Sequence, residues 1–211
     1  MSDVSAVLIG VSLLYIATTG RLESYIKILS VQGFLLFIIA VSKSSEMSFV
    51  LIGVAGFETL LIKAVLIPYF LRKTIRKNEI KNDVESFFSE FVSLFIITFI
   101  LGLGFFTAYL AASSSAVLEP LHFGISISAV LTGFYIIGTR KKLITHIMGY
   151  MFLENGIFLL SLSAAKEMPF IVNLGISMDI FIGVFLAGLF INKIKTNFDE
   201  HNIDDISKLR D

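Results

Sequence analysis

Hydrophobic residues in this chain are gathered in seven blocks, with polar and charged residues collected between them. A helix that crosses the roughly 30 Å hydrocarbon core of a bilayer needs about 20 mainly apolar residues. The second block is the shortest, because Lys27 and Lys43 bracket it closely. The pattern predicts an all-α, polytopic membrane helix bundle with about seven transmembrane helices, at residues 4–20, 25–42, 48–70, 90–112, 121–138, 143–165 and 170–192.

The composition agrees with a membrane protein and excludes several other classes. The chain has 211 residues, of which 55% are hydrophobic and 16% charged, and its mean hydropathy is +0.86. A net charge of zero offers no basic surface for nucleic acid. The absence of cysteine excludes disulfides, thiolate metal sites and cysteine nucleophiles. The opening MSDVS has no basic residue, so it lacks the first part of a secretory signal, and the first block is interpreted as a retained helix.

Basic residues are distributed unequally between the loops, and this predicts the orientation. Fourteen of the 17 Lys and Arg residues follow the first, third, fifth and seventh blocks, which places them on one side. Lys43 and Lys166 fall on the other side, and Lys63 lies inside the third block. By the positive-inside rule the N-terminus is expected outside and the C-terminus in the cytoplasm. The expected location is the cell inner (cytoplasmic) membrane.

Four ionisable residues fall inside the predicted helices: Glu58, Lys63, Glu154 and Asp179. A charge at the bilayer centre costs about 2.5–3.5 kcal/mol on insertion scales, so four would cost roughly 10 kcal/mol if left unpaired. We therefore expect all four to face protein or water. Such residues mark ion pathways more often than they merely hold helices together.

Glu154 and Asp179 are expected to lie at similar depth. Glu154 is roughly 16 Å from the cytoplasmic start of its helix, and Asp179 roughly 20 Å from the cytoplasmic end of the next one. The short link AKEMP makes these helices antiparallel neighbours. Two carboxyls close together in a low dielectric cannot both ionise easily, so one of them can load and release a proton, as a relay requires.

Further polar residues extend this candidate path. His146, Tyr150 and Glu154 follow one another at intervals of four and form a ladder along one side of a helix, from the basic RKK edge to the buried acid. Glu58 and Lys63 are five residues apart, about 140° around an α-helix, so each is expected to need a partner on another helix or subunit. A buried lysine can pass protons or modulate a nearby carboxyl.

Other positions are interpreted as structural. Asn155 is expected to bond a neighbouring helix, and Pro68 to mark a kink or a helix end. The stretch GLGFF at 102–106 fits close helix packing, and four further glycines are expected at packing positions: Gly149, Gly156, Gly175 and Gly183.

Three segments of the C-terminal half resemble a known family. These are GTRKKLITHIMGYMFLENGIFLLSL, MPFIVNLGISMDIFIGVFLAGLFINKI and the tail NIDDISKLR, and with ETLLIKAVLIPYFLRK further upstream they resemble component E (HyfE-type) of hydrogenase-4-type, group 4 [NiFe]-hydrogenases. The last three predicted helices are also similar to the NuoK-type subunit of complex I and to the MrpC-type antiporter subunit. Asp179 falls where the NuoK-type family has its third-helix carboxylate. Glu154 lies one turn beyond the second-helix carboxylate, whose place is taken by Met151.

The resemblance implies an organisation in four parts. Residues 1–89 would hold three transmembrane helices and a basic cytoplasmic loop, and residues 90–120 a linking helix and an outer loop. Residues 121–195 would form the NuoK-like three-helix unit, and residues 196–211 a cytoplasmic tail.

The resemblance also implies a function. The chain would be a membrane-arm subunit of an energy-converting, complex I-like hydrogenase, without an active site or cofactor of its own. Iron–sulfur clusters and a nickel–iron site would belong to peripheral partner subunits, and antiporter-like subunits would be its membrane neighbours. The alternatives are a purely structural or assembly subunit and an Mrp-type cation/proton antiporter subunit. A stand-alone enzyme is disfavoured because no nucleophile–base pair or cofactor motif is visible, and the transported ion could be H⁺ or Na⁺.

Overall fold

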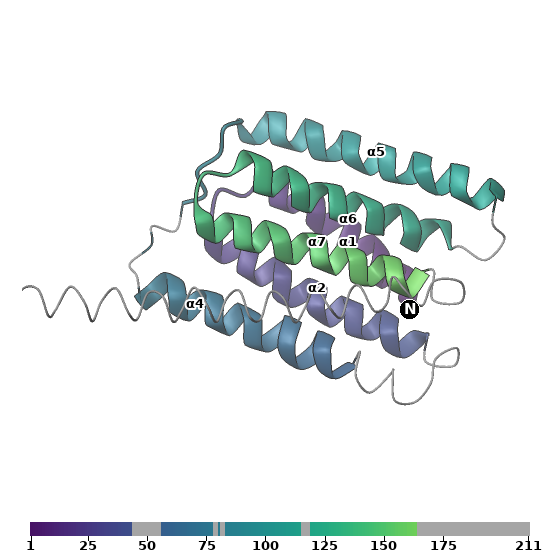
Figure 1. The fold of residues 1–211 in the computed structure, drawn as a ribbon, viewed down its shortest axis with the longest axis horizontal. Helices are drawn as coiled ribbons and strands as arrows, with labels where there is room; N and C mark the ends of the chain where they lie inside the picture. The colour runs from purple at the N-terminus through teal and green to yellow at the C-terminus, as the bar shows by residue number, and fades with distance from the viewer. Residues whose placement is uncertain (44–55, 78–79, 81–82, 115–118, 164–211) are drawn as a thin grey trace, which may run out of the picture. The chain divides into compact units, whose positions relative to one another are not determined.

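The regular secondary structure is helical throughout the part of the chain that the computed structural model describes, namely residues 1–43, 56–77, 80, 83–114 and 119–163. Figure 1 shows these helices lying alongside one another. In chain order they are α1 (Ser2–Thr18), α2 (Leu22–Ser42), the π-helix η2 (Glu58–Leu66), α4 (Ile67–Lys77), α5 (Glu90–Ser114), α6 (Pro120–Thr139) and α7 (Leu143–Ser163).

The helix bounds agree with most of the predicted spans. Four helices, α2, α5, α6 and α7, are long and apolar enough to cross a membrane, and α1 is a shorter apolar helix. One prediction is wrong: the basic stretch after residue 70 was expected in a loop, but α4 continues to Lys77 and carries Arg72, Lys73 and Arg76 on a helix. Residues 48–55 and the seventh predicted span at 170–192 lie outside the described residues.

Close contacts between α6 and α7 depend on glycine. A Cβ atom at Gly133 would lie 2.6 Å from the Leu153 backbone nitrogen, and one at Gly156 would lie 2.7 Å from the Val130 nitrogen. Gly149 faces Ile136 in the same way. The packing roles predicted for Gly149 and Gly156 are therefore confirmed, whereas Gly175 and Gly183 lie outside the described residues.

The contact between α5 and α6 uses one of the two glycines in GLGFF. A Cβ at Gly104 would overlap the Ser128 hydroxyl and lie 2.5 Å from the Gly124 carbonyl oxygen. A Cβ at Gly102 would meet nothing within 4 Å. The packing prediction for this motif therefore holds for Gly104 and not for Gly102.

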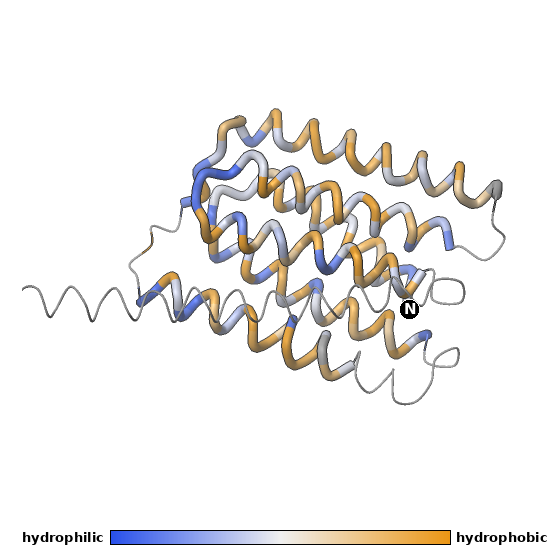
Figure 2. Tube along the Cα trace, in the orientation of Figure 1, coloured by the Kyte–Doolittle hydropathy of each residue, from blue (hydrophilic) through white to orange (hydrophobic). Residues whose placement is uncertain are grey.

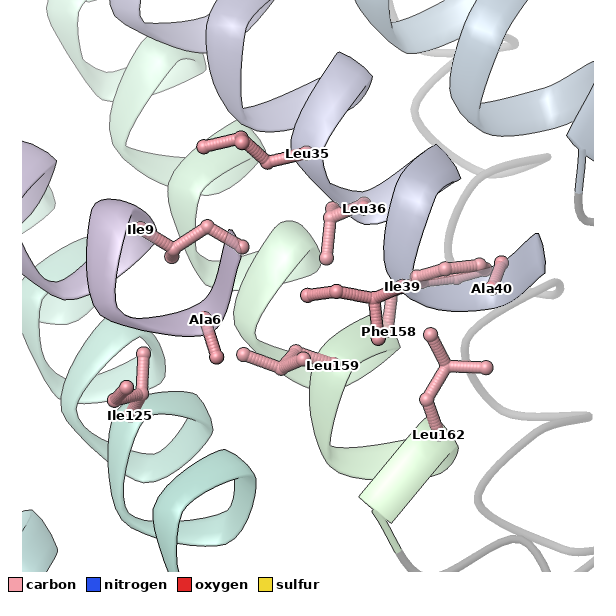
Figure 3. Packing of buried hydrophobic residues seen from close by; sticks show 10 residues of the cluster. All are labelled: Ala6, Ile9, Leu35, Leu36, Ile39, Ala40, Ile125, Phe158, Leu159 and Leu162. Atoms are coloured by element: carbon pink, nitrogen blue, oxygen red, sulfur yellow. The ribbon is translucent and has the colours of Figure 1, made fainter. Parts of the chain in front are cut away.

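A cluster of buried apolar side chains joins α1, α2, α6 and α7 (Figure 3). We call it the apolar layer, and its members are Ala6, Ile9, Leu35, Leu36, Ile39, Ala40, Ile125, Phe158, Leu159 and Leu162. On α1, α2 and α7 these residues occupy consecutive turns, as expected for a stripe that faces neighbouring helices, and α6 contributes Ile125.

The segment 83–87 ties two helix connections together at one end of the bundle. The Val84 amide donates to the Gly20 carbonyl at 2.7 Å, and the Phe87 amide donates to the Thr139 carbonyl at 3.0 Å. Lys142 Nζ donates to the Asp83 carbonyl at 2.6 Å. Figure 2 shows hydrophilic positions gathered where α6 turns into α7 and hydrophobic positions along the helices. The connections predicted to lie on the basic side thus meet at one end.

Candidate functional site

The π-helix η2 has a local cause in the sequence. Pro68 has no backbone N–H to donate to the Ala64 carbonyl, and its ring would clash with that carbonyl, so regular α-helical bonding is interrupted at this point. In η2 the backbone instead bonds from i to i+5, and the Ile67 amide donates to the Ile62 carbonyl. Pro68 therefore marks a junction between two helix types, as its predicted role at a kink or helix end required.

The π register also changes the relation between positions 58 and 63. In a π-helix, residues five apart are joined by a single hydrogen-bonded turn. The separation of about 140° expected from an α-helix does not hold, and the two backbone positions lie toward one side. The structure describes the backbone of Glu58 but not its side chain.

Gly33 on α2 brings η2 close to the bundle. A Cβ at Gly33 would lie 2.7 Å from the Ala64 nitrogen and 2.9 Å from the Lys63 carbonyl carbon. Any side chain at this position would therefore force η2 outward. Because Gly33 has no side chain, the backbone of Lys63 can lie against α2. The Lys63 side chain is buried.

Lys63 and Glu154 form a buried ion pair. Lys63 Nζ lies 2.9 Å from Glu154 Oε1, and the two side chains are 5% and 2% exposed. The ammonium also lies over the Phe158 ring, 4.8 Å from its centroid, as in a cation–π contact. The prediction that Lys63 needs a partner on another helix is confirmed, since Glu154 belongs to α7.

A second polar contact lies beside the ion pair, and the sequence analysis missed its central residue. Gln32 on α2 is 1% exposed. Its Nε2 donates to Ser12 Oγ on α1 at 2.7 Å, and its Oε1 accepts from Asn155 Nδ2 on α7 at 3.1 Å. Asn155 therefore bonds a neighbouring helix as predicted. Gln32 could have been found as a polar residue within an apolar span. It was missed because the search for buried polar residues relied on charge, and glutamine is uncharged.

The two contacts form one polar layer, because Gln32 and Gly33 are adjacent on α2 and Glu154 and Asn155 are adjacent on α7. We use the name polar layer for Ser12, Gln32, Lys63, Glu154 and Asn155. A lysine–carboxylate pair can exchange one proton within itself and stay neutral overall. It can also accept or release one further proton, which changes the buried net charge by one. The geometry therefore suits a proton-storing group.

The other predicted site residues are distributed more widely. His146 Nε2 lies 2.6 Å from the Arg140 carbonyl oxygen, near the end tied by segment 83–87. Tyr150 is half-buried between His146 and Glu154, and no hydrogen bond among the described residues joins these three side chains. Asp179 lies outside the described residues.

A third group of polar residues, also missed by the sequence analysis, lies at the opposite end of the helices. His122 on α6 is 1% exposed, and its Nδ1 lies 2.7 Å from Glu119 Oε2 and 3.9 Å from Asp3 Oδ1. Lys43 Nζ lies 2.9 Å from the same Glu119 oxygen and donates to the Leu162 carbonyl at 3.0 Å. We call Asp3, Lys43, Glu119 and His122 the His122 cluster. The three scattered histidines of the sequence gave no sign of it.

Within the ranges described, no three His, Asp or Glu side chains converge on a position that could hold a metal ion. The described residues form a helical bundle in which four helices have membrane-spanning length and composition, and this indicates a membrane protein.

Comparison with known proteins adds one distant relative. No protein-family model and no solved structure matches the chain. It is similar to "Uncharacterized protein Rv0085" of Mycobacterium tuberculosis (strain ATCC 25618 / H37Rv), with 28% identity over 115 residues, which are 50% of this chain and 52% of that protein. The chain thus spans about half the length of this relative.

Proposed function

We propose that this chain is a membrane-arm subunit of an energy-converting, hydrogenase-type complex. In this proposal the Lys63–Glu154 pair belongs to a proton or sodium path that is coupled to redox chemistry in partner subunits. The class of complex is proposed from the resemblance to component E of hydrogenase-4-type complexes. The buried ion pair is the observation that carries the proposal, because it places two titratable groups in contact within the bundle.

A purely structural role gives a weaker account of this pair. Replacing a buried ion pair by well-packed apolar residues is often neutral or stabilises a protein by 1–4 kcal/mol. Helix association in this layer is already served by Gly33 and by the bonds of Gln32. A pair of charged groups at this depth is better explained by a function that needs them to change protonation state.

In the proposed path, protons reach Glu154 from the end where His146 lies. Each step of four residues along α7 covers roughly 6 Å, so water must bridge from His146 to Tyr150 and from there to Glu154. Lys63 would hold the Glu154 side chain in position. Asp179 is the proposed acceptor on the next helix, and Glu58 a further group on the segment that carries Lys63.

The membrane arrangement is part of the same proposal. The chain would cross the cell inner membrane seven times, with its N-terminus outside and the end tied by segment 83–87 in the cytoplasm. Antiporter-like subunits would be its neighbours in the bilayer. Peripheral subunits would carry the iron–sulfur clusters and the nickel–iron site.

The first test is purification of the tagged chain from its native membrane in mild detergent, with mass spectrometry of the proteins that accompany it. We expect large nickel–iron and iron–sulfur subunits together with antiporter-like subunits. Recovery of antiporter subunits alone would contradict the redox assignment and favour the Mrp-type alternative.

A second test separates ion translocation from assembly, using Glu154→Gln in the same tagged complex. We expect the complex to assemble and transfer electrons while ion pumping falls. Glu23→Gln, an exposed carboxylate on α2, is the matched control and should leave both unchanged. Loss of assembly without a separable pumping defect would favour a structural subunit.

A further inference from the structure

The His122 cluster contains a buried imidazole whose two nitrogens meet different surroundings. Nδ1 faces Glu119, which is 50% exposed, so this side of the ring is connected to water through a carboxylate. Nε2 is enclosed by protein and has no hydrogen-bond partner in the described part of the chain. The Ser2 backbone also lies beside the ring and favours its protonated form.

A buried polar atom without a partner costs free energy, so this arrangement needs an explanation. Histidine passes protons between its two nitrogens by accepting one at one nitrogen and releasing another from the second. The cluster supplies the outward half of such a step, because Glu119 can take the proton from Nδ1 and deliver it to water. The unsatisfied Nε2 is the site that would accept a proton from inside the protein.

The apolar layer separates the His122 cluster from the Lys63–Glu154 pair. The order of residues along α1, α2 and α7 shows this separation. On α1 the layer members Ala6 and Ile9 lie between Asp3 and Ser12. On α2 the layer spans Leu35 to Ala40, between Gln32 and Lys43.

On α7 the layer begins at Phe158, one turn beyond Glu154. It ends at Leu162 (Figure 3). The Leu162 carbonyl accepts a hydrogen bond from Lys43 Nζ.

The thickness of the apolar layer decides whether protons can cross it. Eight residues from Glu154 to Leu162 correspond to roughly 12 Å, and eleven from Gln32 to Lys43 to roughly 16 Å. Direct proton transfer needs a hydrogen bond of about 2.8 Å, so about four linked waters would be required. Buried apolar side chains fill this space, and the described conformation therefore keeps the two polar groups apart.

We propose that His122 is the site at which the ion path exchanges protons with the aqueous phase at the N-terminal end of α6. The apolar layer would be the closed barrier between this site and the Lys63–Glu154 pair. This proposal rests on the proposed function and adds a location and a residue to it. In one transfer, a proton binds at Nε2, the Nδ1 proton passes to the Glu119 carboxylate, and Glu119 releases it to water. The ring is left as the other neutral tautomer, with its proton on Nε2.

The charged groups that face His122 are Asp3 on α1, Lys43 directly after α2 and Glu119 directly before α6. Asp3 and Glu119 favour the imidazolium, whereas Lys43 opposes it and also pairs with Glu119. On α7 the nearest group in the cluster is the uncharged Leu162 carbonyl. Lys43 thereby competes with His122 for the carboxylate, and proton release from Glu119 should depend on external pH.

The experiment compares two variants in the whole complex, assayed in sealed vesicles. His122→Gln removes the proton carrier, and Glu119→Gln keeps an oxygen that can accept from Nδ1 but cannot take up the proton. We expect both to lower pumping about tenfold or more while electron transfer continues. We also expect Glu119→Gln to flatten the dependence of pumping on external pH. Leu121→Val, next to His122 on α6, is the packing control and should pump normally.

A passive assay tests the same site without redox turnover. Leu159→Ser introduces a hydroxyl into the apolar layer, and we expect it to make vesicles leak protons. Adding His122→Gln should abolish this leak.

Normal pumping in both His122→Gln and Glu119→Gln, or a leak that does not depend on His122, would overturn the proposal. If Glu154→Gln still loses pumping in that case, the proposed function stands. If Glu154→Gln pumps normally, the proposed function fails, and the leak assay still decides the role of His122.

Discussion

Replacing Glu154 by leucine removes the carboxylate of a buried ion pair. The ammonium group of Lys63 stays inside the protein. Lys63 is 5% exposed and lies in contact with the removed carboxylate at 2.9 Å. Breaking a buried ion pair by removing one partner costs about 3–5 kcal/mol. We therefore expect Glu154→Leu to lower the free energy of unfolding by about 3 kcal/mol.

The reverse single change and the double change complete the test. Lys63→Met leaves a buried carboxylate and should cost a similar amount. The double variant Lys63→Met/Glu154→Leu replaces the pair by apolar side chains and should cost less than about 1 kcal/mol or even stabilise the protein. The loss of unfolding free energy in the double variant would thus be far smaller than the sum of the losses in the two single variants, as expected for residues in direct contact.

The assay is denaturation of the purified protein with SDS in mixed micelles. Unfolding is monitored as the loss of the helical circular dichroism signal. Glu23→Gln serves as an exposed control and should change the unfolding free energy by less than about 0.5 kcal/mol. Single variants that each cost under 1 kcal/mol, with a double variant equal to their sum, would refute the buried ion pair.

Three further predictions concern the surrounding packing. Gly133→Ala should destabilise the protein in the SDS assay, because its Cβ would lie 2.6 Å from the Leu153 nitrogen, whereas Gly102→Ala should be neutral or stabilise it by up to about 1 kcal/mol. Gln32→Leu leaves the amide of Asn155 without its partner and should cost about 1–3 kcal/mol in the same assay. An equal cost for the two glycine variants, or no cost for Gln32→Leu, would contradict these contacts. Pro68→Ala should permit an α-helical register over Glu58–Leu66 and lower ion pumping although Lys63 and Glu154 are intact. Unchanged pumping would contradict the idea that the π-helical register places Lys63 for pumping.

The sequence predicts the helices well because a bilayer imposes a simple length rule on apolar residues. The bounds of α5, α6 and α7 follow the predicted spans closely, since apolar blocks there end at charged or proline-containing connections. The continuation of α4 to Lys77 was missed because its polar residues satisfy no membrane-length criterion. A hydropathy pattern detects burial in lipid but does not detect a helix that continues beyond it.

The candidate site was only partly predictable from the sequence. Lys63 and Glu154 stand out because each is a charge within an apolar run, but their pairing depends on a π-helix and on Gly33. A π-helix has no residue periodicity that can be recognised in a single sequence. The proline that follows it is the one local signal here. His122 and Lys43 border apolar blocks, where polar residues are ordinary, so only the three-dimensional structure brings them to Glu119.

The most direct test of the central claim is the number of ions translocated per electron pair by the proposed hydrogenase-type complex, purified and reconstituted in sealed vesicles. It would be measured for the wild type, Glu154→Gln and the Glu23→Gln control. We predict that Glu154→Gln transfers electrons at a rate close to the wild type but translocates fewer ions per electron pair, while the control matches the wild type in both. An unchanged ratio in a fully assembled Glu154→Gln complex would contradict the assignment of the Lys63–Glu154 pair to the ion path.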